Sequence, residues 1–133
     1  MKVAELMRTA LKTISADATI ADAVAALTES GVSALPVLDR FGRAVGVLST
    51  REVLKAESAC QGPRARDRLF EETLVLEIMA PWPVTIAPDV DLRNAAREML
   101  YLEAQRLFVA ERGALVGVIS QSDIVGAVAT ARV

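Results

Sequence analysis

Two short motifs in this chain place a serine three residues before an acid, a spacing that suits the binding of a polar ligand. They are Ser49-Thr50-Arg51-Glu52 and Ser120-Gln121-Ser122-Asp123, and each follows a stretch typical of a strand. A helix that begins at such a serine presents unpaired backbone N–H groups and a partial positive charge, which suit a phosphate. An ionised carboxylate only accepts hydrogen bonds, so Asp123 suits a ribose diol, while the hydroxyls of Ser120 and Ser122 add donors.

The same spacing has a purely structural interpretation. Serine followed three residues later by an acid is also a capping box, in which both side chains bond the backbone at the start of their own helix. Glu52 is the acid best suited to that role, whereas Asp123 has Ser122 beside it. We therefore expect ligand binding at Asp123 and a plain cap at Glu52.

Residue counts exclude much catalytic chemistry. The chain has no histidine and one cysteine, Cys60, so it lacks Ser–His–Asp and Cys–His arrangements, the commonest zinc ligand and any internal disulfide. We expect no enzymatic activity, no catalytic residue, no metal site and no cofactor.

Charge and hydropathy limit the partners and the compartment. A formal net charge of −2 gives no basic surface for nucleic acid or an anionic membrane. No apolar run approaches the roughly 20 residues that a membrane-spanning helix needs. The first residues, MKVAELMRT, lack the apolar core of a secretory signal, so a cytoplasmic location is expected.

The chain contains an internal repeat, which sets its organisation. With Met7 aligned on Met79, the two halves stay in one register after a single gap at Phe41. The matched pairs include Thr13 and Thr85, Asp17 and Asp89, Ala23 and Ala95, Leu35 and Leu107, Val37 and Val109, Gly46 and Gly117, and Ser49 and Ser120. A duplicated unit is therefore predicted.

Each copy has the pattern of an α+β module in the order β-α-β-β-α. Thr19 is the expected N-cap of the first helix and Gly31 its end, and Asp91 is the expected cap in the second copy. The expected strands are 12–14, 34–38 and 44–48 in copy one, and 84–86, 107–110 and 115–119 in copy two. Modules are thus expected at 1–58 and 73–133, joined by a linker at 59–72. Its arginines (Arg64, Arg66 and Arg68) are expected to be solvated rather than to bind an anion.

Taken together, three segments resemble the signature stretches of CBS domains. They are Val32-Ser33-Ala34-Leu35-Pro36-Val37, Gly117-Val118-Ile119-Ser120-Gln121-Ser122-Asp123-Ile124 and, more loosely, Gly46-Val47-Leu48-Ser49-Thr50-Arg51-Glu52. The resemblance implies two CBS modules packed about a pseudo-twofold axis, with two clefts between them. In many members these clefts bind AMP, ADP, ATP, S-adenosylmethionine or a dinucleotide, and pairs of modules commonly form homodimers.

The resemblance also implies which residues would line each cleft. The expected ligand-binding set is Lys12, Val32, Ser33, Ala34, Arg106, Ser120, Ser122 and Asp123. Arg106 would reach phosphate, although a surface pair with Glu103 or Glu111 is an equal alternative. The second, weaker cleft would be lined by Ser49, Arg51, Glu52, Val84 and Gln105. Its Glu52 is one methylene longer than the family's aspartate, which predicts poor ribose recognition.

The expected function is that of a regulatory, energy-sensing module that binds an adenine nucleotide or related adenosyl ligand and signals to an unidentified regulated protein. The alternative is a scaffold of the same fold that acts through oligomerisation without a ligand. In either case we expect a homodimer built on the helices after Ser49 and Ser120, because their apolar positions exceed the needs of one core. These positions are Val53, Leu54, Ile124, Val125 and Val128.

Overall fold

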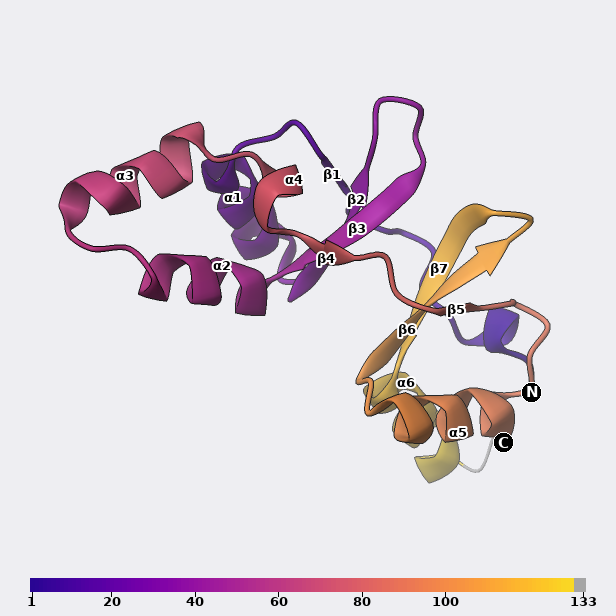
Figure 1. Ribbon diagram of the computed structural model, residues 1–133. Helices are drawn as coiled ribbons and strands as arrows, with labels where there is room; N and C mark the ends of the chain where they lie inside the picture. The colour runs from indigo at the N-terminus through magenta and orange to yellow at the C-terminus, as the bar shows by residue number, and fades with distance from the viewer. Residues whose placement is uncertain (131–133) are drawn as a thin grey trace. The chain divides into compact units, whose positions relative to one another are not determined.

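The computed structural model describes residues 1–130, which fold as two compact units (Figure 1). One unit is continuous, Lys12–Pro83, and we call it the central unit. The other joins Met1–Leu11 to Val84 and the described residues that follow it, and we call it the terminal unit. The division by packing therefore differs from the modules expected from the repeat, because the first eleven residues pack with the second copy.

The central unit has a four-stranded sheet. Its strands, in the order β1-β2-β3-β4, are β1 (Ile14–Ser15), β2 (Ala34–Leu38), β3 (Ala44–Ser49) and β4 (Ala80–Pro81). The β1–β2 pair is parallel, and the other two pairs are antiparallel. Its helices are α1 (Ile20–Ser30), α2 (Thr50–Ser58), α3 (Pro63–Glu72) and α4 (Val75–Ile78).

The terminal unit repeats this plan with a three-stranded sheet. Its strands, in the order β5-β6-β7, are β5 (Thr85–Ile86), β6 (Arg106–Glu111) and β7 (Ala114–Ser120). Its helices are the short 3-10 helix η1 (Val3–Glu5), α5 (Leu92–Leu102) and α6 (Gln121–Ala129). The predicted β-α-β-β-α order is confirmed in both copies, as β1-α1-β2-β3-α2 and β5-α5-β6-β7-α6.

Each unit has its own apolar core, made where a helix face meets a sheet. In α1, Ile20, Ala23 and Leu27 are buried, and their spacing places them on one helical face. In the terminal unit, Leu92, Ala95 and Met99 form the matching buried face of α5. Because both apolar faces recur at the same places in the repeat, one sequence pattern produces two similar cores.

The ends of the two equivalent helices differ. Thr19 and Asp22 form the expected capping box of α1, with Asp22 N–H donating to Thr19 Oγ1 at 3.2 Å. Asp91 occupies the N-cap position of α5, but its side chain makes no capping hydrogen bond, contrary to expectation. Instead, the Leu92 N–H donates to the Met1 carbonyl at 2.9 Å, so a neighbouring backbone takes one of the free donors of the first turn.

The segment expected to be a linker contains a packed helix. Gly62 precedes α3 with a φ of 88°, and Pro63 is its first residue, a position that proline favours. Leu69 is buried against the core of the central unit. The arginines of α3 are exposed, and Arg66 pairs with Glu57 at 3.1 Å. The helix therefore packs on the core through its apolar side and presents its arginines to solvent.

The N-terminal segment joins the terminal unit through paired backbone bonds. Arg8 N–H donates to the Val118 carbonyl at 2.8 Å, and Val118 N–H donates to the Arg8 carbonyl at 3.0 Å. The equivalent segment of copy two, β4, pairs with β3 in the central unit, where Ala80 lies opposite Val47. Each repeat therefore begins with a segment that packs on the β-hairpin of the other repeat.

Within the described residues, no helix combines the length and the apolar character that crossing a membrane requires.

Candidate functional site

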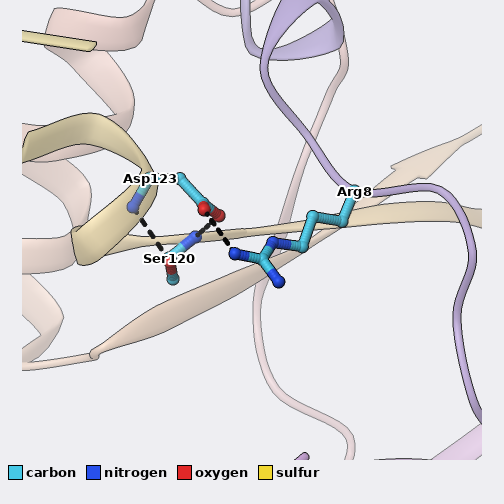
Figure 2. Close-up of polar contacts among 3 residues, drawn as sticks. All are labelled: Arg8, Ser120 and Asp123. Atoms are coloured by element: carbon cyan, nitrogen blue, oxygen red, sulfur yellow. Dashed lines mark hydrogen bonds and ion pairs between the residues drawn. The ribbon is translucent and has the colours of Figure 1, made fainter. Parts of the chain in front are cut away.

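The junction between β7 and α6 holds the carboxylate of Asp123 in a fixed position (Figure 2). Ser120 N–H donates to Asp123 Oδ2 at 2.9 Å, and Asp123 N–H donates to Ser120 Oγ at 3.1 Å. These two bonds form a reciprocal capping box, so the structural interpretation of the motif is correct as far as Oδ2 is concerned. The cap leaves the second oxygen, Oδ1, for another partner.

That partner is Arg8, which sequence reasoning missed. Figure 2 shows its guanidinium directed at the Asp123 carboxylate, with Nη2 to Oδ1 at 3.2 Å. The two side chains differ sharply in exposure, 74% for Arg8 and 12% for Asp123. The guanidinium therefore approaches a largely buried carboxylate from the solvent side.

The surroundings of Asp123 keep it ionised. Burial raises the pKa of Asp123, but hydrogen bonds from the Ser120 backbone and hydroxyl and from Arg8 outweigh that effect, so the pKa lies below its usual range. At neutral pH the site thus offers a fixed negative charge next to the first turn of a helix. Such a group accepts hydrogen bonds from hydroxyl or N–H donors of a ligand.

Other predicted residues lie around the same junction. Arg106 is directly opposite Ser120 in the β6–β7 ladder, and Ser122 is exposed in the first turn of α6. Gln121 ties the helix start to the entrance of β6, since its N–H donates to the Gln105 carbonyl at 2.9 Å and its Nε2 to the Ala104 carbonyl at 3.0 Å. The terminal unit therefore brings both Gln105 and Arg106 next to the start of the Ser120–Asp123 motif.

The remaining predicted residues are divided between the units. Val84 is an exposed residue of the terminal unit. The central unit carries Lys12, Val32, Ser33, Ala34, Ser49, Arg51 and Glu52. Ser33 plays the part that Gln105 plays in the other copy, because its carbonyl accepts from Thr50 N–H at 3.0 Å.

The equivalent junction in the central unit is built differently. Ser49 donates twice to the same oxygen of Glu52, from its N–H at 2.8 Å and from its hydroxyl at 2.7 Å. A hollow of about 510 Å³ opens beside this junction, lined by Arg51, Glu52, Lys55, Ala56, Ala59, Ile78, Met79, Ala80 and Pro81. Ala80 stands where the other copy has Arg8, so the two junctions differ in both the acid and its basic partner.

One sequence signal pointed to Arg8, although it was not followed. The aligned repeat places Arg8 on Ala80, immediately after the matched pair Met7 and Met79. Because one copy has a charged residue here and the other a small apolar one, the two positions are expected to have different roles. The contact itself joins residues 115 positions apart, which spacing alone does not reveal.

Comparison with known proteins agrees with the repeat and the fold. A CBS domain protein of Dictyostelium discoideum is 32% identical over 126 residues, covering 92% of this chain and 87% of that protein. A crystal structure of CBSX2 in complex with AMP superposes with a TM-score of 0.80 at 25% identity, covering 99% and 98% of the two chains. The CBS domain pair of protein MJ0100, solved with 5-methylthioadenosine and S-adenosyl-L-methionine, has the same fold, with a TM-score of 0.81 at 19% identity over 98% of both chains.

Some relatives are much longer than this chain. It spans 58% of the chloroplastic CBSX1 of Arabidopsis thaliana, 14% of an A-adding tRNA nucleotidyltransferase of Aquifex aeolicus and 21% of an inosine-5'-monophosphate dehydrogenase of Korarchaeum cryptofilum. The family model for the CBS domain matches twice, at residues 3–59 and 75–130, once in each copy of the repeat. The chain therefore belongs to the CBS domain family and carries two CBS domains in tandem.

Proposed function

We propose that this CBS pair is a regulatory module that binds an adenosine-containing ligand at the Asp123 junction and signals its presence to a partner protein. The observation that carries the proposal is the carboxylate of Asp123, ionised, largely buried and fixed by the helix cap through Oδ2, with Oδ1 turned to the exposed guanidinium of Arg8. A ribose diol has the donors that such an oxygen accepts.

Two further features support a nucleotide rather than an unspecified polar ligand. The N-terminus of α6 adds a partial positive charge, and Arg8 and Arg106 add two guanidinium groups, which match phosphate oxygens well. CBSX2, which is 25% identical over nearly the whole chain, was solved in complex with AMP. If the ligand is an adenylate, the module reports on cellular energy state.

A thermal-shift screen tests this function directly. The compounds are AMP, ADP, ATP, S-adenosylmethionine and adenosine, with guanosine monophosphate as the control for the base. A ligand that binds only the folded state raises the apparent stability, by about 2.7 kcal/mol at a hundred times its dissociation constant. We expect at least one adenosine compound to raise the melting temperature; no response to any of them would contradict the proposal.

The second candidate is a scaffold that acts through self-association alone, and the surfaces of three helices favour it. Exposed apolar side chains lie on α2 of the central unit, at Leu54, and on α5 and α6 of the terminal unit, at Leu100, Tyr101, Val125 and Val128. Ala96, Met99, Leu100, Gln121, Ile124 and Val125 line an apolar hollow of about 170 Å³ between α5 and α6. Apolar patches of this kind mark interaction sites, so we propose, for both candidate functions, a homodimer in which these helices lose their exposure.

A further inference from the structure

Arg8 is anchored at its backbone and held only lightly at its tip. The two backbone bonds with Val118, at 2.8 and 3.0 Å, fix its Cα beside β7. The backbone approaches so closely because residue 117 is a glycine, from whose Cβ position the Arg8 carbonyl would be 3.0 Å away. The side chain, 74% exposed, reaches Asp123 Oδ1 at 3.2 Å. The guanidinium is thus open to solvent and makes one contact of 3.2 Å with the carboxylate, so a ligand that enters from the solvent side can displace it.

The ion pair crowds the oxygen that the proposed ligand would use. Asp123 Oδ2 accepts from Ser120 N–H within the helix cap, so Oδ1, on the side of Arg8, is the oxygen that we expect a ribose hydroxyl to use. A hydroxyl that bonds to Oδ1 therefore competes with the guanidinium of Arg8. Displacing the guanidinium costs binding free energy, and a second negative group on the ligand can recover it by pairing with Arg8.

The other copy of the repeat serves as an internal comparison. At the equivalent positions it has Ala80 instead of Arg8 and Glu52 instead of Asp123. Glu52 Oε1 accepts both bonds from Ser49. The combination of a cap-fixed aspartate with an anchored arginine thus belongs to the terminal unit.

We propose that Arg8 is a specificity-determining residue that makes the Asp123 site select adenosine ligands with a phosphate over the neutral nucleoside. The inference rests on the proposed function. A ligand with a phosphate gives the displaced guanidinium a new charge-assisted, often bidentate contact, whereas adenosine, which has no anionic group, offers none. Arg8 therefore lowers affinity for the uncharged nucleoside and raises it for the nucleotide.

AMP and adenosine are the matched probes, because they differ only in the phosphate. Calorimetric titrations would compare the parent with Arg8→Ala, Arg8→Gln and Arg97→Ala, the last removing an exposed arginine of α5 as the control for net charge. The parent is expected to prefer AMP by about tenfold or more, the size of one charge-assisted hydrogen bond. Both Arg8 variants are expected to lose most of that preference, with adenosine affinity equal to or above the parent's, while Arg97→Ala keeps it.

The outcomes separate the two proposals. A parent that binds neither probe overturns the proposed function and the role of Arg8 with it. A parent that prefers AMP, with Arg8 variants that keep the same preference, overturns the role of Arg8 and leaves the function standing. A parent that prefers adenosine to AMP also overturns the role of Arg8. Arg8→Gln, which keeps most of the packing length, provides the answer if Arg8→Ala does not fold by circular dichroism.

Discussion

Met7 lies so close to Gly117 that no side chain fits between them: a Cβ on Gly117 would be 2.7 Å from Met7 Sδ and 3.0 Å from the Arg8 carbonyl. The repeat reproduces this contact in the central unit, where a Cβ on Gly46 would be 2.5 Å from Met79 Sδ and 2.7 Å from the Ala80 carbonyl. The absence of a side chain at the two glycines thus allows the first segment of each repeat to pack closely on the hairpin of the other.

Alanine at either glycine is expected to destabilise the protein. Gly117→Ala should lower the free energy of unfolding by about 1–3 kcal/mol, the range for overpacked sites. Gly46→Ala should lower it more, because its obstacle is a backbone oxygen at shorter distance. Gly126→Ala is the control, since that position in α6 is open and alanine favours a helix by about 1 kcal/mol. If urea unfolding gives Gly117→Ala a higher free energy of unfolding than the parent, the close contact is contradicted.

Glu103 is the left-handed residue at the end of α5, with a φ of 55°, where the first copy has Gly31 with a φ of 67°. For a residue with a Cβ, this conformation is less stable by about 1–2 kcal/mol. Glu103→Gly should therefore stabilise the protein by about 1 kcal/mol, and Gly31→Ala should destabilise it by a similar amount. Thermal unfolding of both variants measures the effect, and equal melting temperatures for all three proteins would argue against it.

Asp123 should make stability depend on acid pH. Its folded pKa is lowered, because the hydrogen bonds from Ser120 and Arg8 outweigh the opposing effect of burial. Its contribution is therefore complete above the unfolded pKa of about 3.9 and is lost as the pH falls through the folded pKa. Asp123→Asn should lose less stability than the parent between neutral pH and the acid side of that window.

Part of the acid sensitivity should survive in Asp123→Asn, because the pKa of Asp39 is lowered too, chiefly by the Arg43 N–H. Asp39→Asn is thus the matched control, and the double variant should show the flattest pH profile. Denaturant unfolding measured across the acid range checks all four proteins. A profile of Asp123→Asn that superposes on that of the parent would contradict the lowered pKa.

The exposed apolar surface of α6 predicts self-association. Val125, 65% exposed, borders the hollow between α5 and α6, so Val125→Glu should shift a dimer toward monomer. Phe41→Glu is the control, because Phe41 is as exposed but lies in the β2–β3 hairpin, between Arg40 and Arg43. Light scattering at micromolar concentration measures the mass. A monomeric parent, with and without AMP, would contradict the homodimer.

The duplicated fold was predictable because the signals that set it are local. Caps such as Thr19–Asp22, the terminating Gly31 and the short apolar runs of the hairpin strands act within a few residues. The helix α3 was missed because Gly62-Pro63 was interpreted as a loop, whereas proline is also a favoured first residue of a helix. The expected cap at Asp91 was wrong: the residue occupies the N-cap position of α5, but its side chain makes no capping hydrogen bond.

The Ser120–Asp123 motif could be predicted from the sequence, but its contact with Arg8 could not. The Ser120–Asp123 spacing indicated both a cap and an acceptor, and the cap is present. Arg8 was missed because the repeat alignment assigns it to the first module, while the fold packs it on the second. Sequence spacing describes neighbours along one element, and it does not show which hairpin a swapped segment will join.

The central claim is that Asp123 binds the ligand and that Glu52 does not. Calorimetric titration of AMP into the parent, Asp123→Ala and Glu52→Ala tests it most directly. Loss of one hydrogen bond to a charged group is worth roughly 1.5–3 kcal/mol, so Asp123→Ala should weaken AMP binding by about tenfold or more, while Glu52→Ala should bind like the parent. An Asp123→Ala protein that has a lower melting temperature but binds AMP with parental affinity would contradict the account, because the capping box would then be the whole role of Asp123.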